Sequence, residues 1–252
     1  CPKGASIGKL HDDPDRLRTP MVRRADGWHT ATWDEAFAVI AERLPPLLEA
    51  HGPDALAFYF GNPSVHDHSV PLAATALRRA VGTKYHFSAS TLDQLPKQVA
   101  SALMFGTGDS IAIPDIDRTD YFLVLGANPL VSNGSLFTAP DMPGRLRALR
   151  ERGGRLVVVD PRRTRTADAA DEHLAIRPGT DALFLAALVH TLFAEGLVRL
   201  RDAKPWVKGV EDVRTVIAPF GPDQVADRCG IDADTIRRIA RELVAAPTAV
   251  VY

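Results

Sequence analysis

The chain has little of what defines several classes of protein. Its 252 residues include only two cysteines, Cys1 and Cys229, which is too few for a disulfide framework. No apolar run is long enough to span a bilayer, and no leader with a charged start and an apolar centre precedes the first structural signals. We therefore expect a globular chain without membrane insertion, in the cytoplasm unless an export signal lies upstream.

The chain also lacks an excess of charge of either sign. Its formal net charge is -1, so it has no basic surface of the kind that nucleic-acid binding requires. We therefore expect no nucleic-acid partner. Hydrophobic residues make up 46% of the sequence, enough for one large domain or two small ones to bury a core.

Two glycine motifs that hold phosphates are missing as well. No G-x-G-x-x-G follows a predicted strand, and G-x-x-x-x-G-K-[ST] does not occur. A nucleotide bound by this chain must therefore be held by other residues than those of common NAD or P-loop sites.

The first regular elements are predicted after an irregular stretch that is rich in Gly, Pro, Asp and Arg. Thr32 and Glu35 form a capping-box pattern, which predicts the start of a helix that Pro45 and Pro46 should bend or break. Residues 55–60 are typical of a buried strand, and a helix is predicted over 70–81. Gly82 should end that helix.

A second series of strands and helices follows. Strands are predicted at 121–125, 155–159 and 173–176, and helices at 143–152 and 182–195, the latter capped by Thr180. Asp232 should cap a last amphipathic helix before a strand at 248–252. The alternation predicts an α/β fold: a parallel, doubly wound, Rossmann-like sheet with helices on both faces, preceded by a short irregular N-terminal segment.

Polar residues and glycines follow three of these strands directly. Ligands of open α/β sheets bind beyond the carboxyl ends of the strands, and there an Asp can accept from a guanine edge or a ribose while Arg and helix N-termini hold a diphosphate. Each group taken alone could be a turn or a helix cap, but together they favour a nucleotide site. The candidate residues are Gly126, Asn128, Asp160, Arg162, Pro178, Gly179, Thr180 and Asp181.

These motifs carry a resemblance that extends over nearly the whole chain. In order, they are Cys1 to Gly4, Asp15 to Leu17 with Pro20, Trp33 to Ala36, Gly126 to Pro129, Asp160 to Arg162 with Thr164 and Thr166, Ala170 with Asp171, and Arg177 to Asp181. In this series they resemble signatures of the molybdopterin oxidoreductases of the dimethyl sulfoxide reductase and formate dehydrogenase type.

The resemblance implies a division of the chain and a set of cofactors. Residues 1–30 would be the remnant of an iron-sulfur cluster domain, 31–86 a first α/β segment, and 87–252 a Rossmann-like domain that binds a pterin dinucleotide. The parent protein would hold two molybdopterin guanine dinucleotides, Mo or W, and a 4Fe-4S cluster. The eight candidate residues would bind one of the two dinucleotides.

The resemblance also implies roles for residues near the N-terminus. Cys1 would be the last of four cluster cysteines, and Lys3 would lie between cluster and pterin. Because the three preceding cysteines are absent, this chain should not assemble a cluster, and Cys1 is expected to be a free thiol.

The residue that completes the metal coordination is expected within 85–94, where no cysteine occurs. Ser88 is the preferred metal ligand, with Ser90 and Asp93 as alternatives, and Ser88 could equally well satisfy a loop. His86 is the candidate for a group on the substrate side.

Two functions therefore follow from the sequence. In the first, the chain is an internal piece, inactive alone, of an enzyme that transfers electrons between a substrate at molybdenum or tungsten and an iron-sulfur relay. Its partners would be the remaining domains of the parent and a redox partner or iron-sulfur subunit. In the second, it is a non-redox nucleotide-binding or interaction module with the same fold.

Overall fold

The computed structural model describes residues 2–61, 64, 66–132 and 139–252. Its contacts divide the chain into two compact units, Pro2–Ile111 and Ala112–Tyr252. Each unit is described by itself below.

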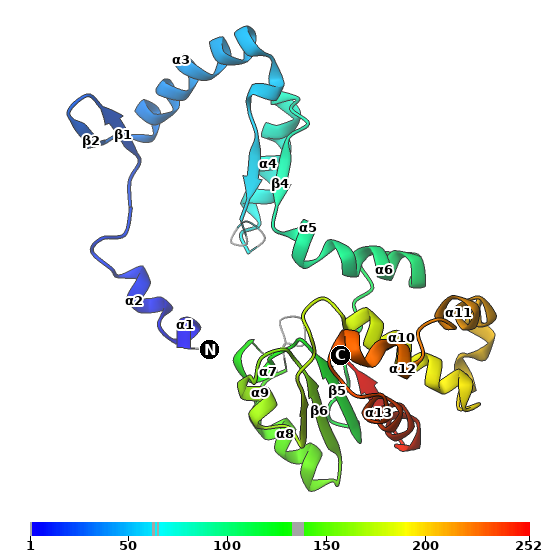
Figure 1. Cartoon of the computed structure of the whole chain (residues 1–252). Coiled ribbons are helices and arrows are strands. Elements are labelled where there is room, and N and C mark those ends of the chain that lie inside the picture. Colours follow the sequence, from blue (N-terminus) through cyan, green and yellow to red (C-terminus); the bar gives the residue numbers. More distant parts are fainter. Residues whose placement is uncertain (1, 62–63, 65, 133–138) are drawn as a thin grey trace. The chain divides into compact units, whose positions relative to one another are not determined.

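The first unit begins with short elements (Figure 1). Two short helices, α1 (Pro2–Ala5) and α2 (Ile7–His11), precede a hairpin of the antiparallel strands β1 (Met21–Arg24) and β2 (Gly27–Thr30). The segment that was expected to be irregular thus contains two short helices and a short hairpin.

Helix α3 (Trp33–His51) starts as the capping box predicts. The Thr32 hydroxyl accepts the backbone N–H of Glu35, and the Glu35 carboxylate accepts the N–H of Thr32 at 2.8 Å. The helix continues through Pro45 and Pro46, so of the two expected effects the break is wrong and the bend stays a prediction. Both prolines are exposed, so the carbonyl groups that lose their partners there can turn to water.

The rest of the first unit contains a parallel β-α-β element. It consists of β3 (Phe58–Phe60), α4 (Ser69–Val81) and β4 (His86–Ser88), with a 3₁₀ turn η1 (Pro53–Ala55) before it. Gly82 ends α4 in the left-handed conformation, as predicted. The prediction of a buried strand is wrong, because among the described residues β3 pairs only with β4, and Tyr59 is 71% exposed. Helices α5 (Ser90–Asp93) and α6 (Leu95–Phe105) follow.

The second unit is built on a four-stranded parallel sheet with the order β7-β6-β5-β8. Strands β5 (Tyr121–Leu125) and β6 (Arg155–Val159) lie where they were predicted. Strand β7 (Glu172–Leu174) is shifted slightly toward the N-terminus, and β8 (Ala249–Val251) is the terminal strand.

Helices cover both faces of this sheet, because successive side chains of the central strands point to opposite sides. Tyr121 and Leu123 pack with α10 (Asp181–Ala194), α12 (Pro222–Cys229) and α13 (Ala233–Ala245). Phe122 and Val124 pack against α8 (Met142–Glu151) and α9 (Arg165–Asp168). The predicted fold class, a parallel α/β sheet with helices on both faces, is confirmed.

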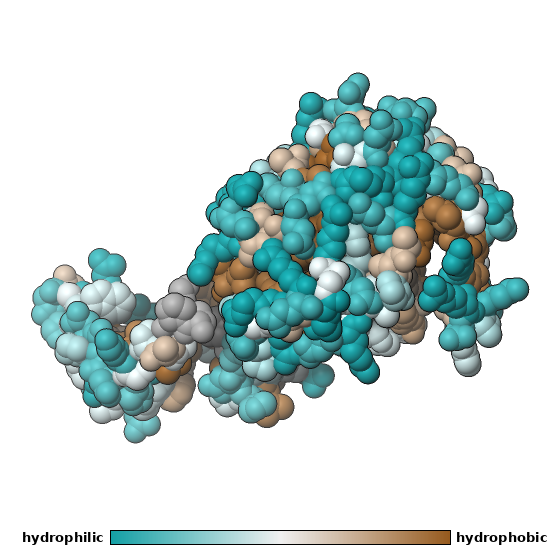
Figure 2. Space-filling view, turned by 90° about the horizontal axis from the view of Figure 1, so that it is seen from below, coloured by the Kyte–Doolittle hydropathy of each residue, from teal (hydrophilic) through white to brown (hydrophobic). Residues whose placement is uncertain are grey.

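Three more elements complete the second unit: α7 (Pro129–Ser132), η3 (Arg201–Trp206) and α11 (Val210–Ile217). Polar side chains dominate the surface in Figure 2, and apolar ones show between them. Within the described residues, no helix combines the length and apolar character that crossing a membrane requires.

Candidate functional site

The carboxyl ends of three neighbouring strands form one rim of the sheet, since β7, β6 and β5 are adjacent and parallel. Backbone hydrogen bonds join the turns that follow them. The N–H of Gly126, after β5, donates to the carbonyl of Val159 at 2.9 Å, and the N–H of Asp160, after β6, donates to that of Leu174 at 3.1 Å. The three predicted groups of site residues are thus brought together at this strand-end rim.

The turn after β5 contains Gly126 and Asn128. Gly126 has φ 64°, and a Cβ added there would meet no atom within 4 Å, so the backbone is open to a ligand. Asn128 is half-buried, and its Oδ1 accepts the hydroxyl of Thr166 at 2.7 Å. The backbone N–H of Leu130 donates to the same hydroxyl at 3.2 Å.

The turn after β6 contains Asp160, which is buried, and Arg162, which is exposed. The Asp160 Oδ1 accepts the N–H of Arg162 at 2.8 Å, and its carbonyl lies 2.9 Å from Nε2 of His173. Within the described residues, Oδ2 of Asp160 has no hydrogen bond and the Arg162 guanidinium has no ion pair. By contrast, Arg163 pairs with Asp168 at 2.7 Å. Oδ2 of Asp160 is therefore available as an acceptor for a ligand, and the Arg162 guanidinium is available to pair with a negative charge.

The turn after β7 leads into α10. Arg177 is tied to the neighbouring loop, because its N–H donates to the carbonyl of Cys229 at 2.8 Å and its Nη1 to that of Asp227 at 2.7 Å. Gly179 has φ 78°. Thr180 precedes α10 as predicted, but its hydroxyl donates to the Arg177 carbonyl at 2.7 Å instead of accepting a helix N–H. The expected side-chain cap is therefore replaced by a bond that closes the turn.

The rim carries both hydrogen-bond acceptors and a cation. Asp181 is the first residue of α10, where the partial positive charge of the helix start favours its carboxylate. Because Asp181 already places a carboxylate at this helix start, this end of the rim suits a hydrogen-bond donor better than a phosphate. The open backbone at Gly126 and the unpaired Arg162 suit an anion.

The candidates from 85–94 lie in the first unit, around a pocket of about 330 Å³. His86 and Ser88 lie on β4, and Ser90 and Asp93 on α5, and all four line this pocket. The N–H of Ser90 donates to the Ser88 hydroxyl at 3.2 Å. Ser88 therefore satisfies a local backbone group while its oxygen still lines the pocket, so the two interpretations of Ser88 are compatible.

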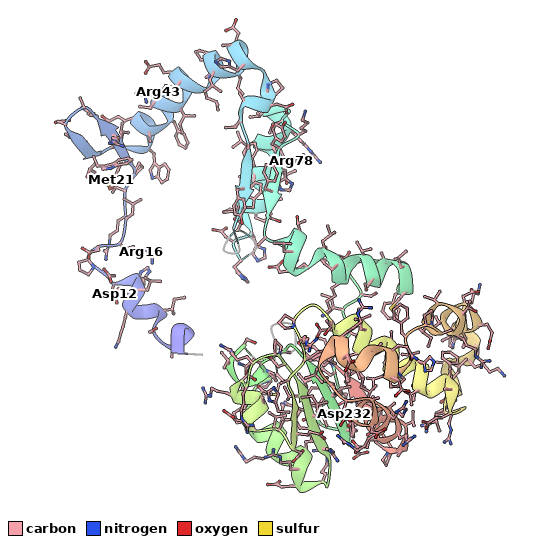
Figure 3. All side chains as sticks on the ribbon, viewed as in Figure 1. Asp12, Arg16, Met21, Arg43, Arg78 and Asp232 are labelled. Carbon is pink, nitrogen blue, oxygen red and sulfur yellow. The ribbon has the colours of Figure 1, made fainter. Side chains whose placement is uncertain are left out.

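Arg78 on α4 (Figure 3) lines the same pocket and was not singled out by the sequence. Its guanidinium forms no ion pair within the described part of the chain. Its position on a helix with an ordinary amphipathic pattern gave no signal of a site, since only the pairing of β3 with β4 places α4 beside Ser88.

Two predicted residues at the N-terminus are not tested. Cys1 and the side chain of Lys3 lie outside the described residues. The other cysteine, Cys229, is fully buried among apolar side chains of the second unit. Among the described residues, no group of three or more His, Cys, Asp or Glu side chains could hold a metal ion.

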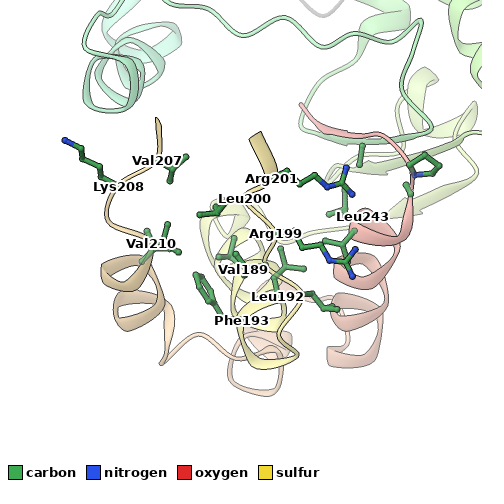
Figure 4. A pocket seen from close by; sticks show the side chains of 17 residues that line it. Val189, Leu192, Phe193, Arg199, Leu200, Arg201, Val207, Lys208, Val210 and Leu243 are labelled. Carbon is green, nitrogen blue, oxygen red and sulfur yellow. The ribbon is translucent and has the colours of Figure 1, made fainter. Parts of the chain in front are cut away.

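A further pocket, of about 500 Å³, lies in the second unit between α10, α11 and the end of α13 (Figure 4). Its walls are mostly aliphatic, for example Leu192, Val213 and Leu243, with Arg199 and Arg201 at its edge. None of the residues predicted for the nucleotide site lines it.

The fold and the rim define a class of protein: a parallel α/β domain whose strand-end turns carry polar residues and which lacks a glycine-rich phosphate loop. Comparison with known families makes this specific. The family description "Molybdopterin oxidoreductase" matches residues 16–209. The chain belongs to the molybdopterin oxidoreductase family, as its motifs indicated.

Individual relatives agree with this assignment. The chain is 30% identical to formate dehydrogenase H of Escherichia coli over 94% of its own length and 33% of that protein's. It is 31% identical to the molybdopterin-containing subunit of thiosulfate reductase from Salmonella typhimurium, over 100% of its own length and 32% of the other's. The chain thus spans about a third of the length of these curated relatives.

A solved structure shows the same fold. Acetylene hydratase from Pelobacter acetylenicus matches 100% of this chain and 34% of its own chain, with a TM-score of 0.80 and 23% sequence identity.

Proposed function

We propose that this chain contributes one guanine dinucleotide site and part of the active-site wall to a molybdenum or tungsten oxidoreductase. The parent would transfer electrons between its substrate and an iron-sulfur relay. The observation that carries the proposal is the strand-end rim, where the three groups of predicted residues lie at adjacent strand ends. The family to which the chain belongs supports it, because that family is described as molybdopterin oxidoreductases. When bound, the metal and its pterin supply the redox chemistry, and the protein supplies orientation and charge.

The residues at the rim fit such a ligand. Gly126 would let the backbone approach the diphosphate, and Arg162 would neutralise part of its charge. The free oxygen of Asp160 and the carboxylate of Asp181 would accept hydrogen bonds from ribose hydroxyls or guanine N–H groups. Asn128, Pro178, Gly179 and Thr180 would shape the two flanking turns.

The residues of this chain do not fit an iron-sulfur cluster, which needs four thiolates. The chain has two cysteines, of which Cys229 is enclosed in the core. A cluster in the parent would need cysteines from outside this chain, and the roles proposed for Cys1 and Lys3 depend on them. Remaining domains of the parent and an iron-sulfur subunit or redox partner are accordingly the proposed partners.

The pocket beside Ser88 is proposed as this chain's part of the metal site. Its oxygen-bearing side chains, above all Ser88 with Ser90 and Asp93 as alternatives, are the groups offered to molybdenum or tungsten, and His86 is the group offered to the substrate. In the full-length protein, X-ray absorption spectra at the Mo and W edges of the wild type and of Ser88→Ala check this assignment, because they report which atoms coordinate the metal. An unchanged set of oxygen ligands in Ser88→Ala would remove Ser88 as a ligand.

The nucleotide site is tested by calorimetric titration of the 252-residue chain with GDP. Asp160→Ala and Asp181→Ala should each weaken binding by about tenfold or more, since a hydrogen bond to a charged group contributes about 1.5–3 kcal/mol. Asp212→Ala, which removes an exposed carboxylate of α11, is the matched control and should bind like the wild type. Equal behaviour of all three variants would remove the site.

A further inference from the structure

A buried hydroxyl ties the turn after β5 to the segment after β6. Thr166 on α9 has no exposed surface. It donates to Oδ1 of Asn128 at 2.7 Å and accepts the backbone N–H of Leu130 at 3.2 Å. It therefore contacts the turn at two points, one of which is the side chain of a proposed ligand-binding residue.

In the structure, the oxygen end of the Asn128 amide faces Thr166. A hydroxyl has one proton to donate, and here the proton goes to the amide oxygen. The amide nitrogen then lies on the opposite end of the group, and within the described residues it makes no hydrogen bond. Asn128 can thus offer two N–H donors to a ligand while its acceptor is already engaged.

We propose that Thr166 is a positioning residue that fixes Asn128 as a hydrogen-bond donor to an anionic oxygen of the bound nucleotide. The inference rests on the proposed function, because it assigns a role within the same rim. It goes beyond that function because it assigns an orientation to the bound nucleotide along the rim. The β5 end presents donors to the diphosphate, and the β7 end presents the carboxylate of Asp181.

The groups beside Asn128 also favour an anionic ligand. Gly126 leaves its turn open to close approach, and Arg162 on the adjacent strand end keeps an unpaired positive charge. Donors and positive charge therefore gather around Asn128, which is the surrounding that a phosphate oxygen requires. A purely structural Thr166 would need only to accept the N–H of Leu130, and its bond to Asn128 would then be dispensable.

The proposal is tested with GDP and guanosine as probes of the 252-residue chain. Thr166→Val keeps the shape but removes the hydroxyl, and it should weaken GDP binding by about fivefold to tenfold, the range expected for one lost hydrogen bond. Thr166→Ser keeps the hydroxyl and should restore binding. Asn128→Asp keeps the acceptor for Thr166 but replaces the donors, so GDP binding should fall by about tenfold or more while guanosine binding changes little.

Either of two binding results would overturn the proposal: Thr166→Ser binding GDP as weakly as Thr166→Val, or Asn128→Asp binding GDP as well as the wild type. Thermal unfolding of each variant shows whether the fold is retained. An NMR measurement of the Asn128 side-chain amide is independent of the ligand: its order parameter should fall in Thr166→Val. If the wild type binds neither probe, the proposed function fails. An order parameter that is unchanged in Thr166→Val would overturn the orienting role of Thr166, whatever the binding results.

Discussion

At the scale of single residues, charged side chains gather at the amino ends of the strands, opposite the strand-end rim. Arg155 at the start of β6 pairs with Glu172 at 2.5 Å, and Arg238 on α13 pairs with the same carboxylate at 2.5 Å. Glu242 accepts from Arg238 at 2.9 Å and from the hydroxyl of Tyr121 at 2.8 Å. The group links three strands to α13 and so stabilises the sheet at the end opposite the strand-end rim.

This cluster predicts a pH dependence of stability. Burial by itself would raise the pKa of Glu172, but hydrogen bonds from Arg238 and Arg155 outweigh it and hold the pKa below its ordinary value of 4.5. A carboxyl with a lowered pKa contributes stability above the pKa of the unfolded chain and loses that contribution as the pH falls through the folded pKa. Glu172→Gln should therefore lower the free energy of unfolding near neutral pH, and the difference from the wild type should shrink below pH 4.5.

Urea unfolding between neutral and acid pH checks this expectation. Glu211→Gln is the control, because Glu211 is 75% exposed and, in the part of the chain that the structure describes, its one ion pair is with Arg214 at 3.4 Å. A difference between wild type and Glu172→Gln that stays constant down to pH 3 would contradict the role assigned to the ionised carboxylate, since about pH 3 lies below the ordinary range of a Glu.

At the scale of elements, α13 depends on a cap that the sequence predicts. The Asp232 carboxylate (Figure 3) accepts the backbone N–H of Thr235 at 2.8 Å, and this hydrogen bond holds the pKa of Asp232 below its ordinary value. Asp232→Ala should lower the free energy of unfolding by about 1 kcal/mol, because an N–H at the helix start loses its partner.

The matched control for this cap is Asp232→Asn, which keeps an oxygen acceptor. Its free energy of unfolding should differ from that of the wild type by about 0.5 kcal/mol at most. Denaturant midpoints at constant m-value measure both variants. Equal losses in the two variants would show that the charge of Asp232, and not its capping bond, stabilises α13.

Elements with strong local patterns are the ones that sequence predicts well. The central strands are continuous apolar runs, and the side chains of Thr32 and Asp232 cap their helices as the local pattern predicts. The local sequence pattern predicts the structure poorly where contacts between distant parts of the chain determine the conformation. Thr180 turns its hydroxyl back to Arg177, and β3 is shorter and more exposed than its apolar residues suggest.

The candidate site shows the same division. The sequence places Asn128, Asp160 and Asp181 after strands, and a parallel sheet then brings them to one rim. The residues that orient them could not be predicted. Thr166 belongs to one of the family-like motifs, but its contact with Asn128 depends on how α9 packs beside β6. His173 reaches the turn after β6 because β7 pairs with β6, and nothing in the sequence singles it out.

At the scale of the whole molecule, the two units differ in how much core they bury. Within the described residues, the fully buried large side chains all belong to residues 112–252. In residues 2–111, large apolar side chains are exposed instead, including Leu72 at 75%, Leu92 at 88% and Leu103 at 84%. Exposed apolar surface of this extent is typical of an interface. The relatives are about three times as long as this chain. A parent protein of that length, as proposed above, would supply polypeptide to cover this surface.

This difference predicts how the isolated chain responds to a protease. Cleavage of a folded protein requires local opening, and opening costs least where few apolar groups are buried. Limited trypsin digestion should therefore cut residues 2–111 first and leave a persistent fragment spanning about 112–252, identified by mass spectrometry and N-terminal sequencing. A urea-denatured sample, in which Lys and Arg sites of both units are open, is the control and should lose both parts at similar rates. If fragments from residues 2–111 persist as long as the second unit, the first unit is stable by itself and its exposed apolar side chains do not mark a surface that needs a partner.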